Sequence, residues 1–231
     1  MKIRSVKAIE VDVTPHASTK PRVPKIETNG FVSPMQRYPE LKRSDWDNSW
    51  KRTACVVTAE DGTWGFGLTL HSGVTVPLIN DHIGPVVEGE NCMATERVWD
   101  LMQKATAPYG TAGVSSFAIS AVDNALWDLK GKLLNKPVYE IIGGPQKEKI
   151  FCYASNTDLS YGTENSIDWF LELGFKAVKL FLREGPDAGL AGLNRTEELV
   201  AETREQVGPD VEIAVDCWMS MNTDYMVRLA E

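Results

Sequence analysis

The nine residues Val211-Glu-Ile-Ala-Val-Asp-Cys-Trp-Met219 decide how we interpret the rest of the chain. Val211, Ile213 and Val215 alternate with small or acidic residues, which is the period of two expected of a β-strand. The strand ends in a single acid, Asp216. Because chemistry in a parallel β/α barrel lies at the carboxyl ends of the strands, Asp216 is a candidate metal ligand or catalytic acid. The alternative is a solvated aspartate that only begins a turn.

Strands and helices alternate through the second part of the chain. The pattern predicts strands at 150–154, 176–182 and 211–216, helices at 165–173 and 196–207, and another helix that opens at Asn222. This order requires parallel strands joined by right-handed crossovers. Residues 145–231 are therefore predicted to be the beginning of an α/β, TIM-like barrel. A complete barrel takes roughly 250 residues, so we expect the chain to be truncated at its C-terminal end.

The first part of the chain, residues 1–140, is predicted to be a separate α+β domain. A strand is expected at 3–13 and a hairpin at 53–70, where Asp61-Gly62 supplies the tight turn. Residues 14–50 contain five prolines and no regular pattern. A segment this long is usually functional or disordered, so we interpret it as a lid or substrate-facing loop, with a packed surface loop as the alternative.

The longest helix is expected at 113–135, because its apolar residues recur at spacings of three and four. It carries two acids, Asp123 and Asp128. Five residues apart, these acids do not share a helix face well. We therefore interpret both as structural residues rather than as a catalytic pair.

The composition excludes several classes of partner. A net charge of −8 and a pI near 5.0 argue against nucleic acid and anionic membranes. The four cysteines lack the spacing of a metal site or a disulfide framework. The first residues do not form a signal peptide, and no apolar run approaches the length of a membrane span. We expect a cytoplasmic protein that acts on a small molecule.

Two segments carry a family resemblance. The helix with Ala125-Leu-Trp-Asp128 and the following Lys136-Pro-Val-Tyr-Glu-Ile-Ile-Gly-Gly144 resemble the enolase superfamily, in particular the mandelate-racemase-type acid-sugar dehydratases. Asp216-Cys-Trp-Met-Ser220, together with Ser33-Pro-Met-Gln-Arg-Tyr38, is most similar to the L-rhamnonate dehydratases. The resemblance implies an N-terminal capping domain and a modified barrel. The third strand of that barrel ends in the first magnesium ligand, here Asp216.

The resemblance also implies proton abstraction beside a substrate carboxylate, with Mg²⁺ stabilising the enediolate that forms. One aspartate cannot hold Mg²⁺, so two further acids and a histidine base are expected beyond Glu231. The family has a Lys-x-Lys pair at the second strand, where this chain has Lys179-Leu-Phe181. The base on this side of the site is therefore lost.

Lys179 is the candidate catalytic cation near the bound carboxylate. The alternative is a structural lysine that pairs with an acid on the barrel floor. Arg43 is the candidate substrate-binding residue of the capping loop. The three histidines, His16, His71 and His82, are expected to be non-catalytic.

The predicted function is Mg²⁺-dependent dehydration of an aldonic acid to a 2-keto-3-deoxy acid by a homo-oligomer. A racemase or epimerase of a 2-hydroxy acid is the alternative within the superfamily. It needs bases on both faces of the carbon, and Phe181 counts against it. An alternative from another class is a truncated, non-catalytic chain that binds a partner through an open sheet edge. By itself the present chain is expected to be inactive.

Overall fold

The computed structural model describes residues 1–11, 32, 34–38, 51–155 and 166–231, which fall into two compact units. The first unit contains the described residues up to Glu148, apart from 32 and 34–38, which cluster with the second unit. From its place in the sequence, this short segment was expected to belong to the first domain. One reason for the difference is local: Val32 is buried, and its N–H donates to the carbonyl of Leu182 at 2.8 Å.

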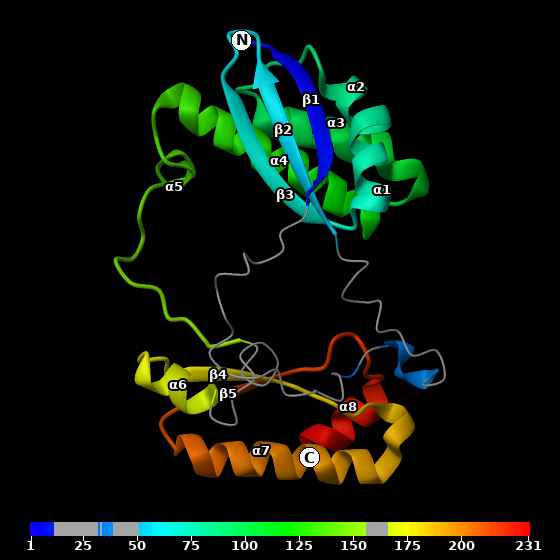
Figure 1. The fold of residues 1–231 in the computed structure, drawn as a ribbon, viewed down its shortest axis with the longest axis vertical. Coiled ribbons are helices and arrows are strands. Elements are labelled where there is room, and N and C mark those ends of the chain that lie inside the picture. Colours follow the sequence, from blue (N-terminus) through cyan, green and yellow to red (C-terminus); the bar gives the residue numbers. More distant parts are fainter. Residues whose placement is uncertain (12–31, 33, 39–50, 156–165) are drawn as a thin grey trace. The chain divides into compact units, whose positions relative to one another are not determined.

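The first unit is built on a three-stranded antiparallel sheet (Figure 1). Its strands run in the order β1 (Ile3–Val11), β2 (Arg52–Ala59) and β3 (Trp64–Leu70), and β2 and β3 form the predicted hairpin. The helical elements of this unit follow in chain order: α1 (Ser72–Pro77), the π-helical turn η3 (Leu78–Ile83), α2 (Gly84–Val87), α3 (Thr95–Thr106), the short 3-10 turn η4 (Ala107–Tyr109), α4 (Val114–Leu134) and α5 (Val138–Ile141).

Helix α4, predicted at 113–135, lies directly against β3 because glycines line the strand face beneath it. A Cβ atom at Gly65 would lie 1.9 Å from the carbonyl oxygen of Ala125, and one at Gly67 would lie 2.0 Å from that of Ala121. No larger residue fits at either position. The alternating glycines of β3 thus set the distance between the helix and the sheet.

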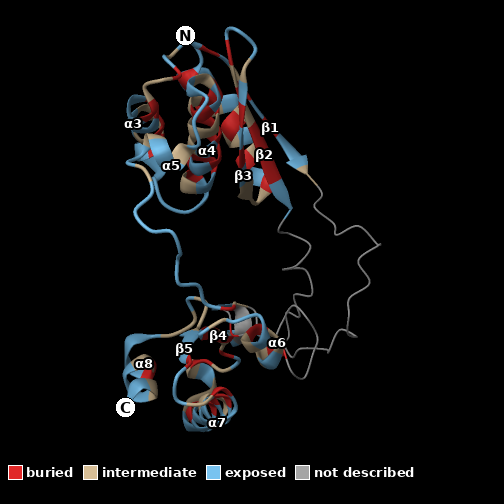
Figure 2. Cartoon of the chain, turned by 90° about the vertical axis from the view of Figure 1, so that its left-hand side faces the viewer, coloured by how far each residue is buried: buried red, intermediate tan, exposed pale blue. Residues whose placement is uncertain are grey.

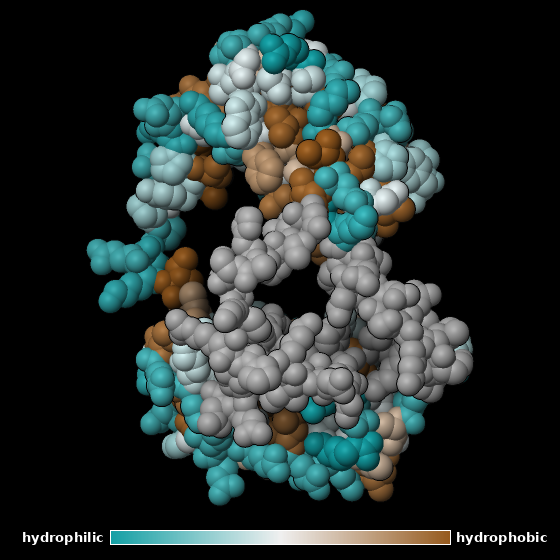
Figure 3. All heavy atoms as spheres, in the orientation of Figure 1, coloured by the Kyte–Doolittle hydropathy of each residue, from teal (hydrophilic) through white to brown (hydrophobic). Residues whose placement is uncertain are grey.

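The core of the first unit lies between the sheet and its helices, where the buried residues of Figure 2 concentrate. Its fully buried large side chains come from both layers: Ile3, Val6, Val57, Ile79, Ile83, Val87, Met102, Ile119, Leu126 and Leu129. The opposite face of the sheet is only partly covered by the described residues, because Ala54 is buried there but its register partners are not. Ile9, Phe66 and Leu68 remain exposed there, and hydrophobic residues gather on this face in Figure 3.

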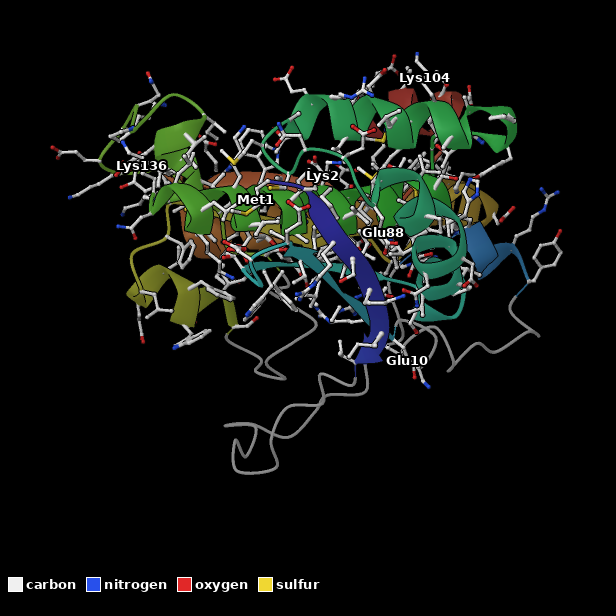
Figure 4. All side chains as sticks on the ribbon, turned by 90° about the horizontal axis from the view of Figure 1, so that it is seen from above. Met1, Lys2, Glu10, Glu88, Lys104 and Lys136 are labelled. Carbon is white, nitrogen blue, oxygen red and sulfur yellow. The ribbon has the colours of Figure 1, made fainter. Side chains whose placement is uncertain are left out.

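Two glutamates, Glu88 and Glu10, connect strand β1 to neighbouring segments through hydrogen bonds. Glu88 accepts the N–H of Val6 at 3.0 Å, and Glu10 lies at the far end of the strand (Figure 4). The two carboxylate oxygens of Glu10 accept hydrogen bonds of 2.6 Å from Lys51 and from the hydroxyl of Ser72. Because Lys51 precedes β2, this cluster joins the end of one strand to the start of the next.

The second unit contains two of the three predicted parallel strands, together with their helices. Its elements are the 3-10 turn η1 (Pro34–Arg37), α6 (Ser166–Glu172), β4 (Ala177–Phe181), η5 (Pro186–Ala188), α7 (Gly189–Val207), β5 (Glu212–Asp216) and α8 (Thr223–Ala230). The core under this sheet is formed by Ala154, Phe170, Val178, Val207 and Val211. Of the apolar face predicted for the last strand, Val211 is buried, whereas Val215 is 38% exposed.

Two predicted boundaries are wrong. Residues 150–154 do not form a full strand: only Ala154 pairs, through an isolated bridge to Val178, and Ile150 is 78% exposed. An extended segment forms a β-strand only where a neighbouring strand makes backbone hydrogen bonds along its length. Helix α7 begins at Gly189 rather than at Thr196. Thr196 is buried inside the helix, and its hydroxyl donates a hydrogen bond of 2.9 Å to the carbonyl of Gly192. The predicted start of this helix at Thr196 is therefore seven residues too late.

In the part of the chain that the structure describes, none of the helices has both the length and the apolar character needed to cross a membrane.

Candidate functional site

The candidate site lies where β4 and β5 end. In the parallel register, Lys179 is the partner of Ala214 and Phe181 is the partner of Asp216. Side chains alternate along a strand, so these four residues share one face of the two-stranded sheet. The backbone pairing continues one residue further, because the N–H of Leu182 donates to the carbonyl of Asp216 at 2.9 Å. The sheet therefore holds the ends of both strands in a fixed relation.

Lys179 and Asp216, predicted separately from the sequence, form an ion pair. The Nζ atom of Lys179 lies 3.0 Å from Oδ2 of Asp216. The other carboxylate oxygen, Oδ1, accepts the backbone N–H of Trp218 at 3.0 Å. The side chains of the pair are 19% and 31% exposed, respectively. Both oxygens of Asp216 are thus oriented by donors of this unit.

These contacts determine the charge of Asp216. Partial burial raises the pKa of the carboxyl group, but the hydrogen bonds from Lys179 and Trp218 and the positive charge of Lys179 together outweigh it. The resulting pKa lies below the ordinary value for an aspartate. Asp216 is therefore ionised at neutral pH, and it presents the kind of hard anionic oxygen that Mg²⁺ prefers.

Two aromatic rings also lie near Lys179. Its Nζ atom lies 4.9 Å from the ring centroid of Phe181 and 5.4 Å from that of Tyr153. Both distances are within the range of cation–π attraction. The ammonium group is thus held between a carboxylate and two rings. From the sequence, Phe181 is only the residue that replaces a base. The sequence gives no sign of a role for Tyr153, although Tyr153 directly precedes Ala154, which pairs with β4.

A tight turn follows Asp216. Trp218 and Met219 both have positive φ angles, 39° and 59°. Residues other than glycine rarely adopt such backbone conformations. The N–H of Ser220 donates to the carbonyl of Cys217 at 3.0 Å, and its hydroxyl donates to that of Trp218 at 3.2 Å. Helix α8 then begins where the sequence predicts it. Asn222 caps the helix by accepting the N–H of Tyr225 at 2.8 Å.

Of the other predicted residues, two lie outside the described part of the chain and two belong to the first unit. Arg43 and His16 lie outside the described residues. His71 and His82 belong to the first unit, where they contact Phe117 and Tyr109. Within the described ranges, no group of three or more histidines, cysteines or acids could hold a metal ion. Asp216 fits Mg²⁺ by its chemistry, but it supplies only one of the ligands that the ion needs.

Comparison with known proteins supports the resemblance noted in the sequence. Residues 49–143 match the N-terminal domain of the mandelate racemase / muconate lactonizing enzyme family. The chain is 39% identical over 202 residues to an L-rhamnonate dehydratase of Saccharopolyspora erythraea, a match that covers 86% of this chain and 50% of the relative. The chain thus spans about half the length of that relative.

Solved structures agree with the sequence match. The crystal structure of L-rhamnonate dehydratase from Gibberella zeae is similar with a TM-score of 0.82 and 29% identity, covering 99% of this chain and 54% of that one. A crystal structure of rhamnonate dehydratase from the same organism, complexed with Mg, has a TM-score of 0.82 and 28% identity, and the match covers 99% of this chain and 56% of that one. These similarities confirm the predicted fold class, a capping domain followed by the first part of a β/α barrel.

Proposed function

From the similarity to the L-rhamnonate dehydratases, we propose that the protein containing this chain is a Mg²⁺-dependent dehydratase of L-rhamnonate or a closely related aldonic acid. The reaction removes the proton on C2, beside the carboxylate. The C3 hydroxyl then leaves as water, and the resulting enol tautomerises to a 2-keto-3-deoxy acid. The Asp216–Lys179 pair at the exits of adjacent parallel strands is the observation that carries this proposal.

In this proposal the two residues have different roles. Asp216 is one oxygen ligand of the metal, and its lowered pKa keeps it anionic over the physiological range. Lys179 is a fixed cation that attracts the substrate carboxylate to the same place. When bound, Mg²⁺ acts as a Lewis acid for the enediolate that forms as the C2 proton leaves. The remaining metal ligands and a histidine base must come from outside the described residues, and Arg43 remains a proposed substrate contact.

Phe181 favours the dehydratase over a racemase. A racemase needs one group to remove the proton and another to return it on the opposite face of the carbon. Phe181 is the register partner of Asp216, and a phenyl ring cannot transfer a proton. The side chains that β4 contributes to the site are therefore the ammonium group of Lys179 and the aromatic ring of Phe181. A cytoplasmic location and assembly as a homo-oligomer remain predictions.

The experiment that tests the function is Asp216→Asn in the full-length protein. The change keeps the size of the side chain and removes its charge. We expect kcat on L-rhamnonate to fall roughly 10³-fold, on the scale of losing one electrostatic stabiliser of the transition state. The melting temperature should fall only modestly, because the change removes the charge of the Lys179 ion pair but takes no side chain out of the core.

Asp210→Asn is the matched control, because Asp210 is an exposed acid in the turn before β5. It should keep parental turnover. If Asp216→Asn turns over L-rhamnonate at nearly the parental rate with saturating Mg²⁺, Asp216 is not a metal ligand. If the parental protein has no dehydratase activity on L-rhamnonate or related aldonic acids, the proposed function is rejected, and a non-catalytic role becomes the better explanation.

A further inference from the structure

Asp123 of helix α4 is a partly buried acid that the proposed dehydratase site does not use. Asp128, on the same helix, has clear structural partners, because it accepts the N–H of Phe66 and pairs with Lys132, each at 2.8 Å. Asp123 differs: no described residue gives its carboxylate a hydrogen bond or an ion pair. The expectation that both acids are structural therefore leaves Asp123 without a structural partner.

Asp123 lines a pocket between α3 and α4, two helices that pack side by side (Figure 2). The pocket has a volume of about 440 Å³. Small-molecule sites in proteins measure roughly 300–1,000 Å³, so the volume suits a small ligand. Three of the residues that line the pocket are acids, two are tryptophans and none is basic: Thr95, Glu96, Trp99, Asp100, Asp123 and Trp127.

The two tryptophans give this pocket a surface that attracts cations. Trp99 is 46% exposed, and Trp127 is half-buried. Trp127 already interacts with a cation of the chain itself, because Nζ of Lys130 lies 4.8 Å from its ring centroid and donates to the hydroxyl of Thr95 at 3.3 Å. Tryptophan is the side chain that attracts cations best, and the attraction grows where water is excluded. The pocket therefore combines aromatic rings with negative charge.

The position of Asp123 is unfavourable for an acid that has no ligand. Burial raises the pKa of its carboxyl group, and no described positive charge offsets this effect. An unpaired charge that is partly removed from water lowers the stability of the folded protein. Asparagine has the same size and would avoid this cost. A bound cation would supply the partner that the described part of the chain does not.

We propose that the pocket between α3 and α4 binds a small organic cation, whose alkylated ammonium group contacts Trp99 and Trp127 and pairs with Asp123. This site lies in the first unit and is independent of the dehydratase function proposed above. Asp100 has only an exposed pairing of 3.8 Å with Lys104, so its charge also favours a cationic ligand. A metal ion is not the expected ligand, because the acids of the described chain form no group that could hold one.

Choline is the probe that tests the proposal, in calorimetric titrations of the full-length protein. Its matched neutral analogue is 3,3-dimethyl-1-butanol, which has a carbon atom in place of the charged nitrogen and therefore lacks the attraction to the rings and the carboxylate. We expect choline to bind about tenfold or more tightly than this analogue. Asp123→Asn and Trp99→Leu should each weaken choline binding by about fivefold or more. Both variants should keep the parental turnover of L-rhamnonate.

Asp81→Asn and Trp64→Leu are the matched controls. Asp81 is an exposed acid of η3 that does not line the pocket, and Trp64 of β3 is 49% exposed, close to the value for Trp99. Both controls should bind choline as the parent does. The proposal is overturned if the parent does not bind choline, if the neutral analogue binds as tightly, or if the controls lose as much affinity as the pocket variants. Asp123→Asn should melt no lower than the parent at neutral pH, so its loss of binding is separable from a loss of folding.

Discussion

Gly65→Ala tests how closely helix α4 packs on the sheet of the first unit. The added Cβ would lie 1.9 Å from the carbonyl oxygen of Ala125 and 2.4 Å from the backbone nitrogen of Leu129. Ordinary contacts begin at 3.4 Å, so the helix or the strand must shift by about 1.5 Å. Overpacking of this kind costs roughly 1–3 kcal/mol or more. We expect the free energy of unfolding to fall by an amount at or above the upper end of this range, because both obstacles are backbone atoms within a long helix.

The assay is urea unfolding followed by circular dichroism, with the parental protein measured beside the variant. A loss of about 3 kcal/mol should also lower the melting temperature by roughly 10 °C or more. Gly73→Ala is the control, because a Cβ there meets nothing within 4 Å and Gly73 lies within α1. It should be neutral or stabilising by up to about 1 kcal/mol. A Gly65→Ala protein within 0.5 kcal/mol of its parent would refute the close packing.

Two acids of α4 give further predictions. Asp128 accepts the N–H of Phe66 at 2.8 Å, so Asp128→Ala should cost about 1–2 kcal/mol in the same urea assay, and an unchanged midpoint would argue against this bond. Burial raises the pKa of Asp123 above its ordinary value of 3.8. The folded state therefore holds this proton more tightly than the unfolded chain, and that contribution to stability is lost as pH rises through the raised pKa. Asp123→Asn should melt higher than the parent at pH 7, and the difference should vanish below pH 3.8; an equal or lower melting temperature at neutral pH contradicts this.

The sequence was most informative where the signal is local. The hairpin of β2 and β3, helix α4 and the parallel order of β4 and β5 all follow from side-chain periodicity and turn residues within each segment. The start of α7 was misplaced because Thr196 resembles a cap, although its hydroxyl bonds within the helix. Threonine serves in both settings, so residue type alone does not separate them.

Features that depend on distant pairing were harder to predict. Residues 150–154 have the composition of a strand, yet pairing exists only at Ala154. The placement of Tyr153 beside Lys179 depends on that same bridge. The partner of Lys179 was predicted only in part. A pairing acid was one of the two alternatives, but it was expected on the barrel floor, whereas the lysine contacts the strand-end carboxylate of Asp216.

The junction between β1 and β2 has a consequence for how this protein can change over evolution. Val11 and Arg52 are partners in register, and the cluster around Glu10 fastens the two strand ends together. The register at this end of the strand pair is therefore held by side chains of the first unit itself. Selection that keeps Glu10, Lys51 and Ser72 together would preserve this register even as other surface residues of the first unit change.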